Sequence, residues 1–420
     1  MRISTQHIFN LANNSMANAN EAIYKTQEQI STGKRIQSAA DDPVAAVRIN
    51  NLTNYLDTIA QYEKNITTAE NNLSLEESAL TATNNLLQRV EELAVQAGNT
   101  ATLSTVEYDA ISSEIKSRTD ELVSLMNTQN SYGDYIFSGY QSNNPAFLGD
   151  FTNGFTFTGD EGQLSIRVDK NTYVDASDSG KVLFVDVPSN NNTARASVPE
   201  SNRSVPALQM TSPVVVDQAL YDEFYPEDMI ITFNEDANIT PAAKNYTITE
   251  RSTGKILVAD QAYTPGVDIT VQGLSFKISG TPVSSDTGAA NGDQLFIDSS
   301  NTQDVLTTIQ KFYNAMQSYD GSSESREALE AAVADTITNI SSAQEVVNQT
   351  LTSIGARNNT LESVKDLHVD ANLITREVLS DLQDTDYAEA ASRLSAQTLI
   401  LQATQASFLT IRELSLISQI

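Results

Sequence analysis

The chain has 420 residues and carries 25 Lys and Arg against 54 Asp and Glu, a formal net charge of −29 at pH 7. Such a charge repels nucleic acids and anionic membranes, so neither is expected as a partner. Cysteine is absent, which excludes disulfides and thiolate chemistry. No segment approaches the ~18 apolar residues of a membrane span, and no cleavable signal peptide precedes the first helix, so export would need another route.

The first predicted element is a helix with a seven-residue apolar repeat. Phe9, Met16, Ile23 and Ile30 recur at this spacing, which is typical of a coiled-coil stripe. A helix of this length is marginal in water unless a partner covers the stripe. We therefore predict that these four residues lie in an assembly interface.

A Gly-Lys pair follows this helix within the stretch QISTGKRIQSAADDPVAAVRI, residues 29–49. A phosphate loop requires an earlier glycine at the position of Glu28 and a preceding strand, and the sequence has neither. Gly33 instead fits the left-handed residue that closes a helix, with Lys34 and Arg35 near the negative end. A corner between two helices is the preferred interpretation.

The same stretch contains the adjacent carboxylates Asp41 and Asp42. Adjacent carboxylates can bind a metal, act as acid and base, or serve a structural role. Asp42 directly precedes Pro43, and an Asp N-cap followed by proline at the first helical position is a common helix start. No histidine lies nearby and no zinc-type spacing occurs, so we expect no metal, no cofactor and no catalytic residue.

Long helices follow the corner. A seven-residue repeat from Leu52 to Leu87 predicts a helix from Val44 to about Ala97, roughly 80 Å long at ~1.5 Å per residue. Ser104 and Glu107 form a capping box that opens a second helix. Helices return after Asn301, and the stripe from Val333 to Leu361 repeats the period. His368, one heptad further, is predicted to lie on a packed face.

Residues 146–300 change to a period of two, which indicates short strands. We predict one hairpin in which residues 155–157 pair with 164–168, and a second in which residues 246–248 pair with 256–258. Further strands are expected at 269–278. The Asn-, Ser- and Pro-rich stretch 188–213 is interpreted as a linker into a β-rich domain.

The last predicted helix repeats the seven-residue spacing at Leu394, Leu401 and Phe408, with Ile411 three residues later. The predicted fold is mainly α with a β insertion, in which long N- and C-terminal helices pair into a rod. We expect terminal coiled-coil arms at 1–40 with 381–420 that are disordered in the monomer, a rod domain with a β-hairpin at 41–195 with 300–380, and a β-rich outer domain at 205–299.

Several of these motifs resemble the bacterial flagellin superfamily. The corner stretch is similar to the "STGxRI…DDxA" motif, and DLQDTDYAEAASRLSAQTLILQATQAS at 381–407 is similar to the C-terminal helix. Pro43 and the passage YIFSGYQSNNPAF at 135–147 resemble the hook-associated protein 3 branch. The end of the chain lacks the ANQxPQ run typical of filament flagellins.

The resemblance implies a non-enzymatic structural subunit at the junction between hook and filament of the bacterial flagellum. It implies as partners hook-associated protein 1, flagellin, further copies of the chain in a ring or helical tier, and an export chaperone. It also implies export to the cell exterior without cleavage of a signal peptide.

Three other functions are kept open by the residues alone. A filament flagellin shares the bulk features of the sequence. A surface adhesin would place its function in residues 205–299. An enzyme on this scaffold is the least expected, because residues 205–299 contain neither histidine nor cysteine.

Overall fold

The computed structural model describes residues 2–99, 103–151, 154–199, 201–285 and 292–417. The chain divides into two compact units. Unit 1 comprises residues 1–65 and 362–420, and unit 2 comprises residues 66–361. Each unit is built around paired helices from opposite ends of the sequence, as the repeats predict.

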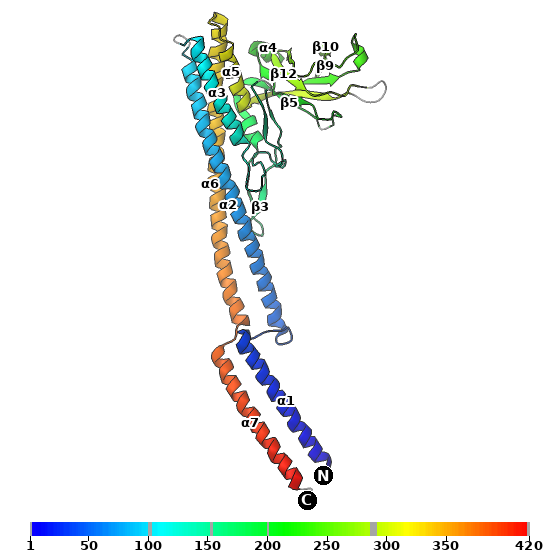
Figure 1. The fold of residues 1–420 in the computed structure, drawn as a ribbon, viewed down its shortest axis with the longest axis vertical. Coiled ribbons are helices and arrows are strands. Elements are labelled where there is room, and N and C mark those ends of the chain that lie inside the picture. The colour runs from blue at the N-terminus through cyan, green and yellow to red at the C-terminus, as the bar shows by residue number, and fades with distance from the viewer. Residues whose placement is uncertain (1, 100–102, 152–153, 200, 286–291, 418–420) are drawn as a thin grey trace. The chain divides into compact units, whose positions relative to one another are not determined.

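Unit 1 is entirely helical apart from its corners. Helix α1 (Arg2–Thr32) lies beside α7 (Tyr387–Ile417), and the rings of Phe9 and Phe408 are 5.1 Å apart between centroids (Figure 1). The unit also holds the start of α2 (Pro43–Ala97) and the end of α6 (Ser323–Gln383). His368 is 3% exposed and stacks on Tyr62 at 5.7 Å, which confirms its predicted packed position.

The helical part of unit 2 contains the rest of α2 and α6 with α3 (Thr105–Met126) and α5 (Val305–Gln317). The seven-residue repeats are buried: Ile66, Leu73, Leu80 and Leu87 on α2, and Val333, Ile340, Val347, Ile354 and Leu361 on α6. Gln344 of α6 donates to Glu91 of α2 at 3.0 Å across the pair. The capping box is present, since the Ser104 amide donates to the Glu107 carboxylate at 2.7 Å. The predicted helix pairing is therefore confirmed.

The segment between α3 and the outer sheets forms two small hairpins. Strand β1 (Phe147–Asp150) pairs with β2 (Gly154–Phe157), and β3 (Ser165–Arg167) pairs with β4 (Tyr173–Asp175). The predicted pairing of 155–157 with 164–168 is wrong. The Asp160 carboxylate accepts from the amides of Tyr140 and Gly162, both at 2.8 Å, and so binds the expected turn to an earlier loop.

The β domain is larger than the sequence indicates. One sheet has the order β10-β9-β8-β13-β5, and a second contains β11, β12, β6 and β7. The elements are η1 (Lys181–Val185), β5 (Val187–Ser197), β6 (Gln209–Met210), β7 (Val214–Val215), α4 (Gln218–Phe224), β8 (Met229–Phe233), η2 (Asp236–Asn238), β9 (Asn245–Glu250), β10 (Ile256–Ala262), β11 (Asp268–Val271), β12 (Leu274–Ser279) and β13 (Gln294–Gln303). The second predicted hairpin is confirmed as β9 and β10, and the strands at 269–278 are confirmed as β11 and β12.

The predicted linker at 188–213 is wrong in its first half. Residues 187–197 form β5, an edge strand that pairs with β13 from Val187 opposite Gln303 to Ser197 opposite Phe296. Its polar residues suit a strand with one neighbour, because the other edge and much of one face meet water. The sheet therefore runs from 187 to 303 and extends beyond the expected bounds of 205–299 at both ends.

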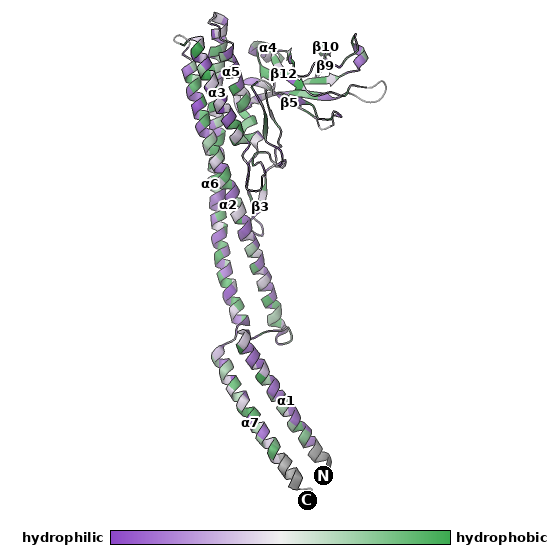
Figure 2. Ribbon diagram, viewed as in Figure 1, coloured by the Kyte–Doolittle hydropathy of each residue, from purple (hydrophilic) through white to green (hydrophobic). Residues whose placement is uncertain are grey.

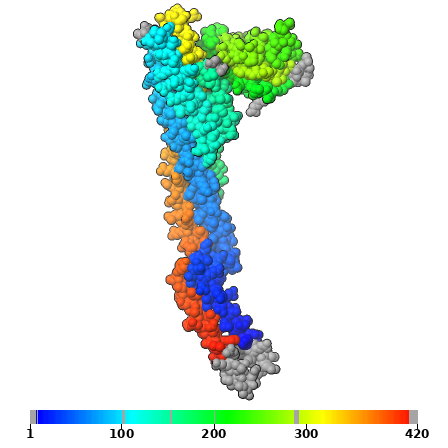
Figure 3. Space-filling model, viewed as in Figure 1, coloured from blue at the N-terminus to red at the C-terminus, as the bar shows by residue number. Residues whose placement is uncertain are grey.

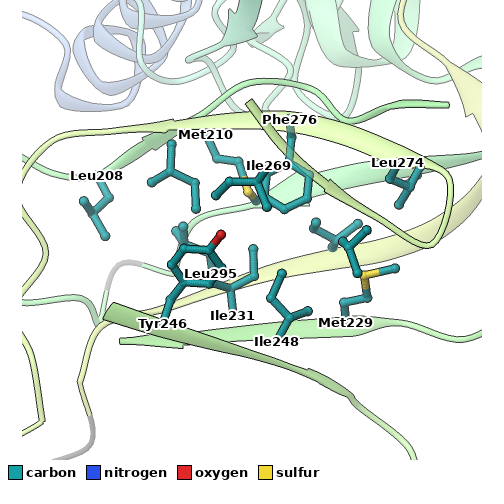
Figure 4. Packing of buried hydrophobic residues seen from close by; sticks show 14 of the residues in the cluster. Leu208, Met210, Met229, Ile231, Tyr246, Ile248, Ile269, Leu274, Phe276 and Leu295 are labelled. Atoms are coloured by element: carbon teal, nitrogen blue, oxygen red, sulfur yellow. The ribbon is translucent and has the colours of Figure 1, made fainter. Parts of the chain in front are cut away.

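The two sheets enclose a separate hydrophobic core. Met229, Ile231 and Ile248 face the second sheet from one side, while Ile269 and Phe276 face back from the other (Figure 4). All five side chains are less than 10% exposed. The space-filling view shows the lobe formed by these strands within unit 2 (Figure 3). The β domain thus has its own source of stability.

A buried ionic cluster joins the small hairpins to both long helices of unit 2. Arg357 of α6 donates to both oxygens of Asp178, at 2.7 and 2.9 Å, and the Asp178 amide donates to Glu76 of α2 at 3.1 Å. Glu76 is 1% exposed. Burial, with the neighbouring charge of Asp178, raises the pKa of Glu76 to about 8. Glu76 therefore holds its proton more tightly in the folded protein than in the unfolded chain.

Candidate assembly surface

The two corners of unit 1 are hydrogen-bonded to each other. Gly33 has φ +71°, the left-handed conformation expected after α1, and its carbonyl accepts from the Thr385 amide at 2.9 Å. The Arg35 amide donates to Gln383 at 2.7 Å, and its guanidinium donates to the carbonyl of Leu382, also at 2.7 Å. Arg35 therefore donates hydrogen bonds to free carbonyl groups in the last turn of α6, whereas the sequence predicted that it lies at the end of α1.

Helix α2 begins at Pro43 with Asp42 as its N-cap. Asp42 Oδ1 accepts from the amides of Val44 at 3.2 Å and Ala45 at 3.0 Å. The Asp42 carboxylate thus satisfies two of the free amides at the helix start. This geometry matches the structural interpretation of the corner.

Asp41 has a different set of partners. Lys25 Nζ lies 2.5 Å from its carboxylate, and the Ser38 amide donates to it at 3.1 Å. The hydrogen bond from Lys25, with those from the backbone, holds the pKa of Asp41 well below its usual range. Both carboxylates are therefore engaged in local structure. Among the described residues, no group of three or more His, Cys, Asp or Glu is placed to hold a metal ion.

The predicted stripes of α1 and α7 lie between the two helices. Phe408 contacts Phe9, and the other stripe residues whose side chains are described are half-buried: Met16, Ile23, Ile30, Leu394 and Leu401. The side chain of Ile411 lies outside those that the structure describes. A two-helix pair cannot enclose its seam, so these residues keep exposed surface although each helix covers the other. Their role in assembly remains a prediction.

A second set of apolar residues in unit 1 was missed by the sequence reasoning. Among the described side chains, more than half of the exposed large apolar ones lie in this unit, which holds less than a third of the chain. Leu399 and Ile400 on α7 are 67% and 57% exposed, and Leu11 on α1 is 60% exposed. Figure 2 shows hydrophobic residues along both helices. The available signal was the run Leu399-Ile400-Leu401, which places apolar side chains on more than one helix face.

These exposed apolar side chains are candidates for contacts with other molecules. None of the helices in the described ranges is both long and apolar enough to cross a bilayer. Apolar side chains of this kind suit contacts with other helices that have apolar faces. The hydrogen bonds at the corner connect the end of α1 to the end of α6. The exposed apolar side chains of α1 and α7 therefore lie on helices that are joined at one end.

Comparison with known proteins supports the resemblance indicated by the motifs. Residues 3–142 match the bacterial flagellin N-terminal helical region. The chain is 32% identical over 190 residues to flagellar hook-associated protein 3 of Salmonella typhimurium, an alignment that covers 45% of this chain and 59% of the relative. It is also 32% identical over 127 residues to flagellin of Bacillus subtilis, which covers 30% of this chain and 42% of the flagellin.

The fold is similar to that of a solved hook-associated protein. The crystal structure of flagellar hook-associated protein 3 from Legionella pneumophila aligns with a TM-score of 0.52 and 23% identity. That alignment covers 80% of this chain and 98% of the other. The chain spans about six tenths of the Salmonella relative that it matches. It therefore has a fold similar to that of hook-associated protein 3, and its residues 3–142 are similar to the N-terminal helical region of bacterial flagellins.

Proposed function

We propose that this protein is a structural subunit of the bacterial flagellum that joins the zone of hook-associated protein 1 to the flagellin filament. The observation that carries the proposal is the combined likeness to hook-associated protein 3, in sequence over 190 residues and in fold over 80% of the chain. The alignment with the flagellin of Bacillus subtilis is shorter, at 127 residues. The junction role is therefore favoured over that of a filament flagellin.

The exposed apolar side chains of unit 1 supply the mechanism. Burying a leucine or isoleucine contributes about 1.5–3 kcal/mol, so a few such residues on each helix give a strong drive to associate. Leu11, Leu399 and Ile400 would be covered by copies of this chain and by the neighbouring axial proteins, hook-associated protein 1 and flagellin. Head-to-tail repetition of one such contact produces a ring or a helical tier.

Folding of the arms is coupled to this association. Unit 1 buries few apolar groups, so α1 and α7 of an isolated monomer are expected to open readily. Protease should cut within 1–40 and 381–420 before it cuts unit 2, and assembly should remove these cuts. Protection of both arms in a verified monomer would show that the unit does not depend on partners.

The same properties suit export before assembly. We infer that the chain passes unfolded through the flagellar export apparatus, held beforehand by an export chaperone, and takes its place outside the cell without cleavage. The role is structural and uses neither a catalytic residue nor a cofactor. Mass spectrometry of the protein from sheared flagella should give an intact N-terminus.

The decisive experiment is electron microscopy of flagella from a strain that lacks this gene. Hooks without filaments, with flagellin released into the medium, are expected, and the wild-type gene should restore filaments. Purified protein provides the second measurement. If it polymerised alone into long filaments, the flagellin role would replace the junction role.

A further inference from the structure

Unit 2 contains a cavity of about 270 Å³ between the β domain and α5, which no structural role explains. Its walls include apolar side chains of β2, β6 and β7, among them Phe157, Met210 and Val215. A second cavity of about 460 Å³ on the side of α6 shares Val215, Gln303 and Lys311 with it. Lys311 of α5 therefore lies where the two cavities meet.

The charged side chains that line the smaller cavity are nearly all paired. The ammonium of Lys181 pairs with Glu161, the guanidinium of Arg195 with Asp186, and Asp298 accepts from Arg251 at 2.9 Å. Asp304 caps α5, and its carboxylate accepts from the Thr307 amide at 3.0 Å. Each of these groups has a neutralising or hydrogen-bonding partner within the chain.

Lys311 is the exception within the described part of the chain. Its side chain is partly buried, and its ammonium has neither a hydrogen bond nor an ion pair with a described residue. The nearest influence of opposite sign is Asp335 of α6, whose carboxylate accepts from the Asn191 amide group at 2.7 Å. Burial lowers the pKa of Lys311. A partly buried cation without a partner loses some of its hydration, and an anionic group supplied from outside would offset that cost.

The size and composition of the cavity narrow the class of ligand. A volume near 270 Å³ admits a small organic molecule but no polymer segment of any length. Lys311 offers an ammonium without a partner, which binds carboxylate and phosphate groups alike as a point charge. The wall mixes polar residues, such as Thr193 and Ser212, with apolar residues that can contact an apolar body: Phe157, Met210 and Val215.

We propose that this cavity binds a small organic anion whose carboxylate or phosphate accepts hydrogen bonds from Lys311 while its apolar body packs against Met210. The site belongs to unit 2 and does not depend on the flagellar role. A junction subunit with such a site would carry a bound metabolite-sized anion beside its β domain. The probes described below distinguish a carboxylate ligand from a phosphate ligand.

The first measurement is thermal melting of the full chain at constant ionic strength with sodium benzoate, phenyl phosphate, inorganic phosphate and neutral benzamide. Benzoate or phenyl phosphate should raise the melting temperature and saturate, because a ligand that binds only the folded state stabilises it. The more effective of the two identifies the preferred group. Inorganic phosphate should act weakly, and benzamide should have no effect.

Two variants test the role of the ammonium. Lys311→Met keeps the length of the side chain and should weaken benzoate binding at least tenfold, whereas Lys311→Arg should retain it. Lys255→Met is the matched control, since the Lys255 side chain is 68% exposed and pairs with Glu250 away from the cavity. If Lys311→Met bound the probes as well as the wild type, the proposal would be overturned.

A second readout does not depend on stability. The chain contains six methionines, so methyl-labelled methionine gives a simple NMR spectrum. The Met210 signal, assigned with Met210→Leu, should move on titration with benzoate or phenyl phosphate and stay in place with benzamide. The Met16 signal from unit 1 should not move. An unchanged Met210 signal with both anions, or an equal shift with benzamide, would contradict an anion site.

Discussion

The two units of this protein use apolar side chains in opposite ways. In unit 1 the buried apolar residues among the described side chains are few: Ile36, Ala45, Ile59 and Ala390. Unit 2 buries the repeats of α2 and α6 and a separate β-domain cluster. Unit 2 therefore carries its stability internally, whereas unit 1 leaves many large apolar side chains exposed.

Buried polar residues follow the same division. In unit 1 they include Thr26, Gln29 and Thr385, which lie near the joined corners, where Gln29 donates to the Arg35 carbonyl at 2.8 Å. In unit 2 they include an ionic cluster with a bidentate Arg357. In unit 1, therefore, the polar contacts lie at the corner and the helices bury few side chains. In unit 2 the ionic cluster connects the elements at the centre.

The largest effect is expected from Leu401→Asp in α7. A carboxylate at this half-buried position of the seam would face desolvation without a partner once neighbouring subunits cover it, at a cost of several kcal/mol. Filament attachment should be abolished, while the melting of unit 2 and the export of the protein stay nearly unchanged. The measurement is motility and filament count in a complemented deletion strain. Gln402→Glu adds the same charge on the exposed side of the helix and should leave the cells motile.

The β domain offers the complementary control. Val187 and Gln303 are paired residues at the ends of β5 and β13, so a short Gly-Ser linker can replace residues 187–303 without separating the flanking chain. Filaments should still attach at least in part. Motile Leu401→Asp cells, or complete loss of filaments from the β-domain replacement despite normal export, would show that assembly depends on the other unit.

The next largest effect is expected from Arg357→Met in unit 2. Removing one partner of a buried pair leaves the other uncompensated, and Asp178 has a side chain only 9% exposed. The free energy of unfolding should fall by about 3 kcal/mol, measured by calorimetry of the monomer. Arg326→Met, an exposed arginine on the same helix, should change it by less than about 0.5 kcal/mol. Equal effects of both variants would mean that the cluster does not fix unit 2.

The sequence predicted the helices better than it predicted this cluster. Leu73, Val347 and their repeats are buried as expected because a sustained seven-residue period has one structural solution. Asp178 lies 102 positions from Glu76 and 179 from Arg357, so no local pattern connects them. Strand β5 was missed for a related reason: its polar edge sequence resembles a loop until β13, about a hundred residues later, pairs with it.

In the candidate assembly surface, too, the sequence predicted local features but not contacts between distant residues. The caps at Gly33 and Asp42 are local, and the structure has the geometry that their neighbours in the sequence indicate. The hydrogen bond from Arg35 to Leu382 joins residues 347 positions apart, so no local pattern in the sequence could predict it. Leu399 and Ile400 were passed over because the repeat singled out only one face of the helix.

Glu76→Gln should change how the free energy of unfolding of unit 2 depends on pH, without an effect on unit 1. The pKa of Glu76 is about 8 in the folded protein, above the ordinary value of 4.5. Between these values the folded state holds a proton that the unfolded state has released, so stability is fully present below pH 4.5 and is lost as the pH rises through 8. The variant lacks this loss, and its stability relative to the wild type should increase by roughly 4 kcal/mol from pH 5 to pH 9.

Urea unfolding of both proteins at pH 5, 7 and 9 measures this difference. Other groups, such as Asp304, whose pKa burial raises to about 6, titrate in both proteins and cancel in the comparison. A difference in stability that stays constant across the range would show that Glu76 is ionised in the folded protein. Protease cuts in the arms of unit 1 should be the same in both proteins at each pH.

The smallest effect is expected from Asp42→Ala at the corner of unit 1. Loss of the N-cap should cost about 1 kcal/mol, roughly a fivefold change in the equilibrium for opening the first turns of α2. Because unit 1 has little core to oppose local opening, hydrogen exchange of residues 43–55 should accelerate by about this factor, while exchange in the buried repeat of unit 2 stays unchanged. Asp57→Ala, an exposed residue inside α2, is the matched control and should leave exchange nearly unchanged. A chelator should affect neither protein, since Asp42 is expected to act on backbone amides alone; faster exchange of the wild type on addition of chelator would show instead that the corner holds a metal ion.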